Sequence, residues 1–126
     1  SSYASARGVP LDYEKAVYWL NKAAEEGFVE AQRKLADIYA YKRGDSAKAY
    51  AWMVVSLSAM FPNAQDLVQV SPDLERLIRS MTPQEIKDGQ TLALQLVERI
   101  KENKKQQEER QKELLARMEQ YQKDAE

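Results

Sequence analysis

The feature that most constrains the fold of this chain is an internal repeat in its first half. The sequence YASARG at residues 3–8 recurs as YAYKRG at 39–44. Residues 18–32 then align with residues 51–65, and this shorter offset places a deletion in the loop between two helices, where a length change costs little. Self-similarity of this period is typical of stacked helical units, so each copy is expected to be one unit of an array.

Each copy is predicted to contain two amphipathic helices. Residues 29–42 carry apolar side chains every three or four positions, at Ala31, Leu35, Ile38 and Tyr39. The other helix is expected over 12–26, with Asp12 as its N-cap. Its inward face is predicted to hold Ala16, Trp19, Leu20 and Ala23. Trp52 is equivalent to Trp19 in the alignment, and both indoles are therefore predicted to lie in the core.

The composition supports an all-α chain without catalytic chemistry. Only 4 glycines and 4 prolines occur, which favours helices. The length of 126 residues is enough for one domain with a modest core. The chain has no cysteine and no histidine, which excludes disulfides, thiol nucleophiles, Ser–His–Asp triads and the usual zinc sites. Neither a catalytic constellation nor a phosphate-cradling glycine loop is present, so no enzyme activity, metal or cofactor is predicted.

Charge and hydropathy exclude two further classes of partner. The 19 basic and 20 acidic residues are interspersed, so no basic surface for nucleic acid is expected. The longest apolar-rich stretch, at residues 51–61, is too short to span a bilayer.

Two consecutive motifs carry a family resemblance. The pattern A-x-x-W-x-x-K-A-A-x-x-G is followed by A-Q-x-x-L-[GA]-x-x-Y. Their residues are Ala16, Trp19, Lys22, Ala23, Ala24 and Gly27, and then Ala31, Gln32, Leu35, Ala36 and Tyr39. This pattern resembles the Sel1-like repeat, a relative of the tetratricopeptide repeat, over residues 3–65. The resemblance implies an α/α superhelix that serves as a protein–protein interaction scaffold. It also favours an exported or periplasmic location in bacteria, with a cytoplasmic location as the alternative.

The first repeat is expected to be incomplete. Helix 12–26 would be the second helix of a pair whose first helix is represented only by residues 3–6. We therefore interpret the chain as the C-terminal part of a longer array, and a partner chain that covers the same apolar face is the alternative.

The domain organisation is predicted as repeats over 1–65, a helical C-terminal cap over 66–100 and a polar helical tail over 101–126. Ser71–Pro72 and Thr82–Pro83 are helix starts with a hydroxyl N-cap and proline at the first helical position, and Glu85 completes a capping box with Thr82. The cap helices are expected to bury Leu74, Leu77 and Ile78, and then Ile86, Ala93, Leu96, Val97 and Ile100. Gly89 indicates a close crossing with another helix, because a glycine there costs about 1 kcal/mol relative to alanine.

The tail carries no apolar residue over 101–113 and then a short apolar stripe, Leu114, Leu115, Met118 and Tyr121. A solvated helix is one interpretation. Self-association, or the docking of a partner on this stripe, is the other.

Partner-binding residues follow from the related tetratricopeptide architecture, in which the first helix of each pair lines the concave surface. The outward residues of helix 29–42 are Glu30, Arg33, Asp37 and Tyr41. The predicted function is thus an adaptor that binds a peptide or helix of a protein partner in this groove. The alternative is a structural protein that assembles through its C-terminal helix.

Overall fold

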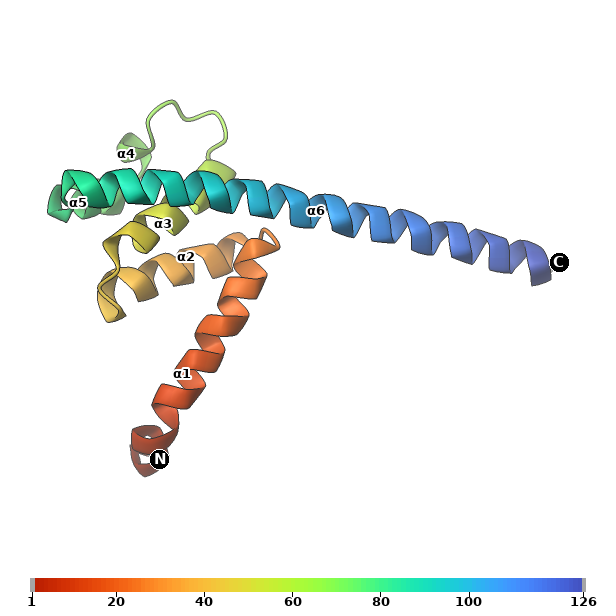
Figure 1. The fold of residues 1–126 in the computed structure, drawn as a ribbon, viewed down its shortest axis with the longest axis horizontal. Coiled ribbons are helices and arrows are strands. Elements are labelled where there is room, and N and C mark those ends of the chain that lie inside the picture. Colours follow the sequence, from red (N-terminus) through yellow and green to blue (C-terminus); the bar gives the residue numbers. More distant parts are fainter. Residues whose placement is uncertain (1, 126) are drawn as a thin grey trace.

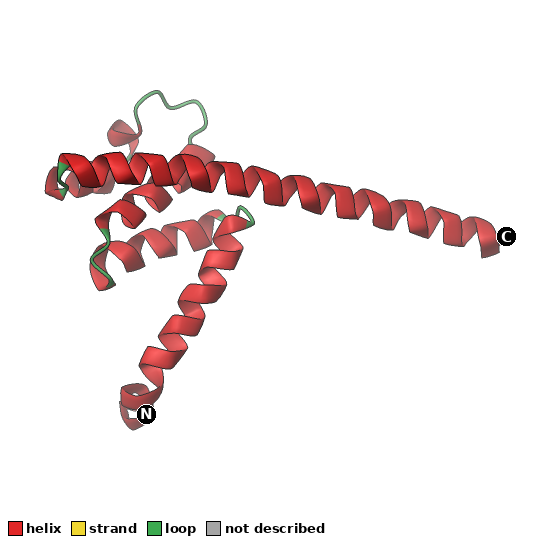
Figure 2. Cartoon of the chain, in the orientation of Figure 1, coloured by secondary structure: helices red, strands yellow, loops and turns green. Residues whose placement is uncertain are grey.

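The computed structural model describes residues 2–125, and describes side chains from residue 13 onward. Within this range every regular element is a helix, which confirms the all-α prediction (Figure 2). The elements are α1 (Ser2–Glu25), α2 (Val29–Asp37), the π-helix η1 (Ile38–Lys42), α3 (Ser46–Met60), α4 (Leu67–Val70), α5 (Pro72–Ser80) and α6 (Pro83–Ala125).

The helices stack in chain order, as expected for a helical-repeat protein. Helix α2 packs between α1 and α3, and α6 runs along α3 before it extends far beyond the other helices (Figure 1). The main core joins α1, α2, α3 and α6 around Leu35 and Trp52, which are 0% and 3% exposed. A smaller cluster holds α5 against α3 through Tyr50, Leu57, Leu74 and Met81. Burial of each such side chain stabilises the fold by about 1.5–3 kcal/mol.

The turn between α1 and α2 follows from one glycine and one glutamine. Gly27 has φ 103°, its N–H donates to Ala24 O at 3.0 Å, and the N–H of Phe28 donates to Ala23 O at 3.1 Å. This pair of bonds is a Schellman motif, which requires the left-handed backbone that glycine adopts without strain. The buried Gln32 side chain also donates to Ala24 O, at 3.0 Å. The motif residues Gly27 and Gln32 therefore complete the C-terminus of α1.

The predicted helix starts in the second half are confirmed. Ser71 Oγ accepts the N–H of Leu74 at the start of α5. Before α6, Thr82 Oγ1 accepts the N–H of Glu85, and Glu85 Oε1 accepts the N–H of Thr82. These reciprocal bonds form the capping box.

Gly89 marks a close helix crossing, also as predicted. It is buried where α6 passes over α3. A Cβ at this position would lie 2.6 Å from Tyr50 Cδ1 and 3.1 Å from Ala47 O. Only a residue without a side chain allows the two helices this separation.

The start of the first helix differs from the prediction. Helix α1 is continuous from Ser2 to Glu25, so Asp12 lies inside it and is not its N-cap. A cap stabilises a helix by only about 1 kcal/mol. Gly8 and Pro10 ahead of Asp12 are poor helix formers, so helix propensity does not explain why the helix continues through this segment.

The prediction that Trp19 lies in the core is wrong. Trp19 is 62% exposed and Ala16 is also exposed, whereas Val17 and Ala24 are the buried residues over 13–25, the part of α1 whose side chains are described. The helix contacts α2 through this neighbouring face, with Leu20 and Ala23 half-buried beside it. The described residues place no helix against the face that holds Trp19. The expectation of a missing first helix stays a prediction.

The predicted division at residue 100 falls inside a single helix. Leu96 and Ile100 pack in the core, and Asn103 Nδ2 donates to Glu25 O at 2.9 Å at the end of α1. Beyond this bond every described residue of α6 is exposed. The predicted boundaries of the cap and the tail stay a prediction.

Candidate functional site

A surface groove lies between α2–η1 and α5. It consists of two adjoining depressions that share Met53 of α3 and Asp73 of α5. Met53, Ser56 and Leu57 line it from α3, which lies between the two walls. Helix α2 precedes the longer α3, and α5 precedes the longer α6 (Figure 1). The groove therefore runs between the first helices of two successive helix pairs.

The first wall comes from α2 and its π-helical extension. Arg33 and Asp37 lie one helical turn apart on α2, and Tyr41 follows on η1. In η1 the N–H of Arg43 donates to Ile38 O at 3.0 Å, five residues earlier. Such π-turns are frequent at functional sites. The π-turn contains both Tyr39, which is buried, and Tyr41, which is 80% exposed at the end of the groove.

The second wall combines α5 with apolar residues of the segment that joins α3 to α5. Met60, Phe61 and Val70 line one end, and all three are exposed although they are apolar. Arg76 and Ser80 of α5 line the other end. The groove therefore has one apolar end and one polar end.

Charges of both signs flank the groove. Arg33 and Asp37 stand on one wall, and Asp73 and Arg76 stand on the other. Asp73 and Arg76 form an exposed ion pair within α5. Exposed pairs of this kind contribute little to stability, so their charges are available to a ligand at low cost.

Three of the four residues predicted to bind a partner line this groove. Arg33, Asp37 and Tyr41 do so. Glu30 lies outside its lining and binds Arg33, with 3.3 Å between Oε1 and Nη1. All four are exposed, as predicted for outward residues.

The opposite wall was missed in the sequence because α5 was interpreted only as part of a cap. Its amphipathic pattern and position after the second repeat are those of another first helix. That signal would have placed Asp73 and Arg76 opposite α2. Met60 at the end of α3 and Phe61 directly after it carry no periodic signal, and only the fold brings them to the groove.

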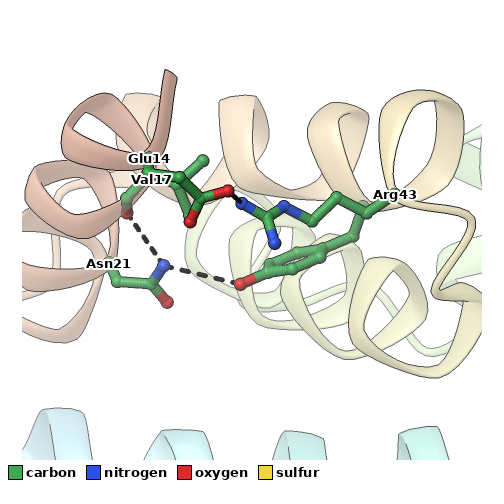
Figure 3. Close-up of polar contacts among 5 residues, drawn as sticks. Glu14, Val17, Asn21 and Arg43 are labelled. Atoms are coloured by element: carbon green, nitrogen blue, oxygen red, sulfur yellow. Dashed lines mark hydrogen bonds and ion pairs between the residues drawn. The ribbon is translucent and has the colours of Figure 1, made fainter. Parts of the chain in front are cut away.

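Polar contacts from α1 hold the first wall of the groove in place. Asn21 Nδ2 donates to Val17 O at 2.9 Å and to Tyr39 Oη at 3.5 Å, and Glu14 binds Arg43 (Figure 3). The nearby Tyr13 hydroxyl, and secondarily the Glu14 carboxylate, hold the pKa of Arg43 above its usual value. Helix α1 thereby anchors the end of η1 that presents Tyr41.

Neither a metal-binding cluster nor a membrane-spanning helix occurs among the residues that the structure describes. Among them, no group of three or more acidic, histidine or cysteine side chains could hold a metal ion. Over the same residues, no helix has the length and apolarity needed to cross a membrane.

Comparison with known families gives a match over residues 2–53. Residues 2–28 and residues 29–53 each match the Sel1 repeat. Sel1 repeats generally mediate protein–protein interaction and typically form non-catalytic scaffolds. No curated protein and no solved structure matches the chain.

Proposed function

Because the chain contains two Sel1 repeats, over residues 2–28 and 29–53, we propose that it is an interaction scaffold without catalytic activity. Its binding site is the groove between α2–η1 and α5. The ligand is an extended or helical segment of a protein partner.

The exposed apolar side chains in the groove carry this proposal. Tyr41 is 80% exposed and Phe61 is 42% exposed, and Met60 and Val70 lie close to Phe61 in the same lining. Clustered exposed apolar residues with a polar rim are typical of protein interaction sites. Tyrosine is also enriched among the residues that dominate binding energy.

The charges define the kind of segment that fits. A ligand with one or two apolar anchor residues would fill the space near Phe61 and beside Tyr41. Acidic groups of the ligand beside these anchors would bind Arg33 or Arg76, and basic groups would bind Asp37 or Asp73. This is the arrangement by which a groove recognises an amphipathic peptide through a few anchors.

A peptide library selected on the immobilised chain tests the proposal. Selected peptides should bind the Tyr41→Ser and Phe61→Ser variants about tenfold or more weakly, because each change removes an anchor contact worth about 1.4 kcal/mol or more. Leu94→Ser is the matched control, since Leu94 is a 70% exposed apolar residue of α6 outside the groove lining. If the affinity of the peptides falls equally for all three variants, or for none of them, the groove is not the binding site.

Two further parts of the proposal rest on the resemblance of the repeats alone. The protein would be exported or periplasmic in a bacterial cell, and its repeats would belong to a longer array.

A second candidate function is assembly through α6. One observation favours it: Leu114, Leu115, Met118 and Tyr121 are 57–80% exposed on a helix that projects away from the domain (Figure 1). The two functions are compatible, because the groove and this stripe lie on different parts of the chain.

A further inference from the structure

The exposed stripe on α6 continues the face by which this helix packs on the domain. Ala93, Val97 and Ile100 lie in or against the core, and Leu114, Met118 and Tyr121 follow at the same alternating spacing of three and four residues. This is the a/d pattern of a coiled coil, with Lys104, Gln107 and Gln111 at the intervening positions. The first part of the face is covered by the chain's own helices, and the second part is exposed.

The same face excludes a parallel pairing of two copies. Asn103 Nδ2 binds Glu25 O on this side of α6. Gln107 and Arg110 line a depression with Lys22 and Glu26 of α1. The α1–α2 turn thus projects from the face that would have to meet a second helix. In a parallel pair the two α1–α2 turns would collide, whereas in an antiparallel pair each domain faces only the other copy's tail.

The flanking charges also favour the antiparallel orientation. The positions next to a coiled-coil seam set partner orientation through ion pairs. In the antiparallel register that places Leu114 against Met118 of the second copy, Arg110 lies beside Asp124 of that copy. In a parallel pair, Arg110 would instead lie beside Leu115 and find no acidic partner. At the two-fold axis Arg117 lies beside Arg117 of the second copy, which is a contact between like charges. Glu113 lies four residues before Arg117 in the same helix, and this spacing allows a favourable ion pair that offsets the repulsion.

We propose that two copies of this chain pair antiparallel through their α6 tails, around a two-fold axis near residue 116. Leu114 packs against Met118 of the second copy, and Leu115 packs beside its own equivalent. This inference extends the second candidate function above. With a rise of 1.5 Å per residue, the points where the tails leave their domains are about 36 Å apart. The dimer therefore presents two grooves, one at each end of a rigid rod.

The size of the contact sets the expected strength of the dimer. Each large apolar side chain of the stripe offers on the order of 100 Å² of exposed surface. The four stripe residues of two copies together bury roughly 800 Å², less than the ~1,000 Å² of a stable specific interface and in the range of a weak, transient contact. The dimer is therefore expected to dissociate at micromolar concentrations. Two grooves on one rod would raise the affinity for a partner that carries two binding segments.

Sedimentation of the complete chain over a range of micromolar concentrations tests the pairing. The unmodified chain should shift from monomer to dimer, and Leu114→Glu should remain monomeric because it places a charge in the seam. Ala116→Glu is the matched control on the opposite, exposed face of the same helix, and it should dimerise normally. A chain that stays monomeric throughout, or a dimer that survives Leu114→Glu, would overturn the proposal.

Two further measurements test the orientation. Arg110→Glu and Asp124→Lys should each weaken the dimer, and the double variant should restore it. Because the chain has no cysteine, a spin label attached through Lys105→Cys reports a single distance. An antiparallel pair predicts about 30–40 Å between labels, whereas a parallel pair predicts about 10 Å. A short distance, or no restoration by the double variant, would overturn the antiparallel arrangement.

The groove proposal can fail independently of this one. A selected peptide should bind the monomeric Leu114→Glu variant with unchanged affinity per site. Loss of the dimer with retained peptide binding separates the two functions, and dimerisation is measured without any peptide present.

Discussion

Replacing Gly89 by alanine tests the closest helix contact in the structure. In an exposed helix this change stabilises a protein by about 1 kcal/mol, because alanine has the higher helix propensity. Here the new Cβ would lie 2.6 Å from Tyr50 Cδ1 and 3.1 Å from Ala47 O. Tyr50 is buried and the Ala47 oxygen belongs to the backbone of α3, so relief requires the two helices to separate. Overpacking of this kind costs about 1–3 kcal/mol. The propensity gain offsets part of this cost, so we expect Gly89→Ala to lower the free energy of unfolding by up to about 2 kcal/mol.

Urea denaturation followed by circular dichroism measures this change. Gln90→Ala is the control, because Gln90 is the exposed neighbour of Gly89 and reports helix propensity without the contact. In a Tyr50→Leu background the cost of Gly89→Ala should shrink, since the ring that meets the new methyl group is gone. If Gly89→Ala stabilises the chain as much as an exposed glycine would, α6 does not cross α3 at this separation.

Two further changes test the core and the tail. Trp52→Ala should cost about 3–5 kcal/mol because it removes a buried indole, whereas Trp19→Ala should cost only about 0.5 kcal/mol; equal losses in thermal denaturation would contradict the burial of these repeat-equivalent residues. Deletion of the chain after Arg110 should change stability by no more than about 0.5 kcal/mol, and amide exchange should show protection falling beyond Asn103. Strong protection around Leu114 in the monomer would contradict the exposed tail.

Features that depend on a few consecutive residues could be predicted from the sequence. The caps at Ser71 and Thr82 and the left-handed turn at Gly27 are local, because each is formed by groups only a few residues apart. The repeat likewise predicted α2 and α3, because the spacing of apolar residues along the chain indicates each helix and the residues between them indicate the loop. Asp12 shows the limit of such reasoning, because a weak local signal did not set the start of α1.

Features that depend on several helices required the tertiary structure. Three predicted site residues lie on one helix and could be named from its period. Their opposite wall, with Asp73 and Phe61, comes from segments whose position is set by how α5 packs on α3.

The two tryptophans show the physical reason most directly. Trp19 and Trp52 occupy equivalent positions in one repeating pattern, so the sequence by itself determined that both belong to an apolar helix face. The tertiary structure decided that only Trp52 is buried, because α3 packs against both α2 and α6, whereas α1 meets α2 through the neighbouring face of Val17 and Ala24. A residue's hydrophobicity is local, but its burial depends on which helix covers it.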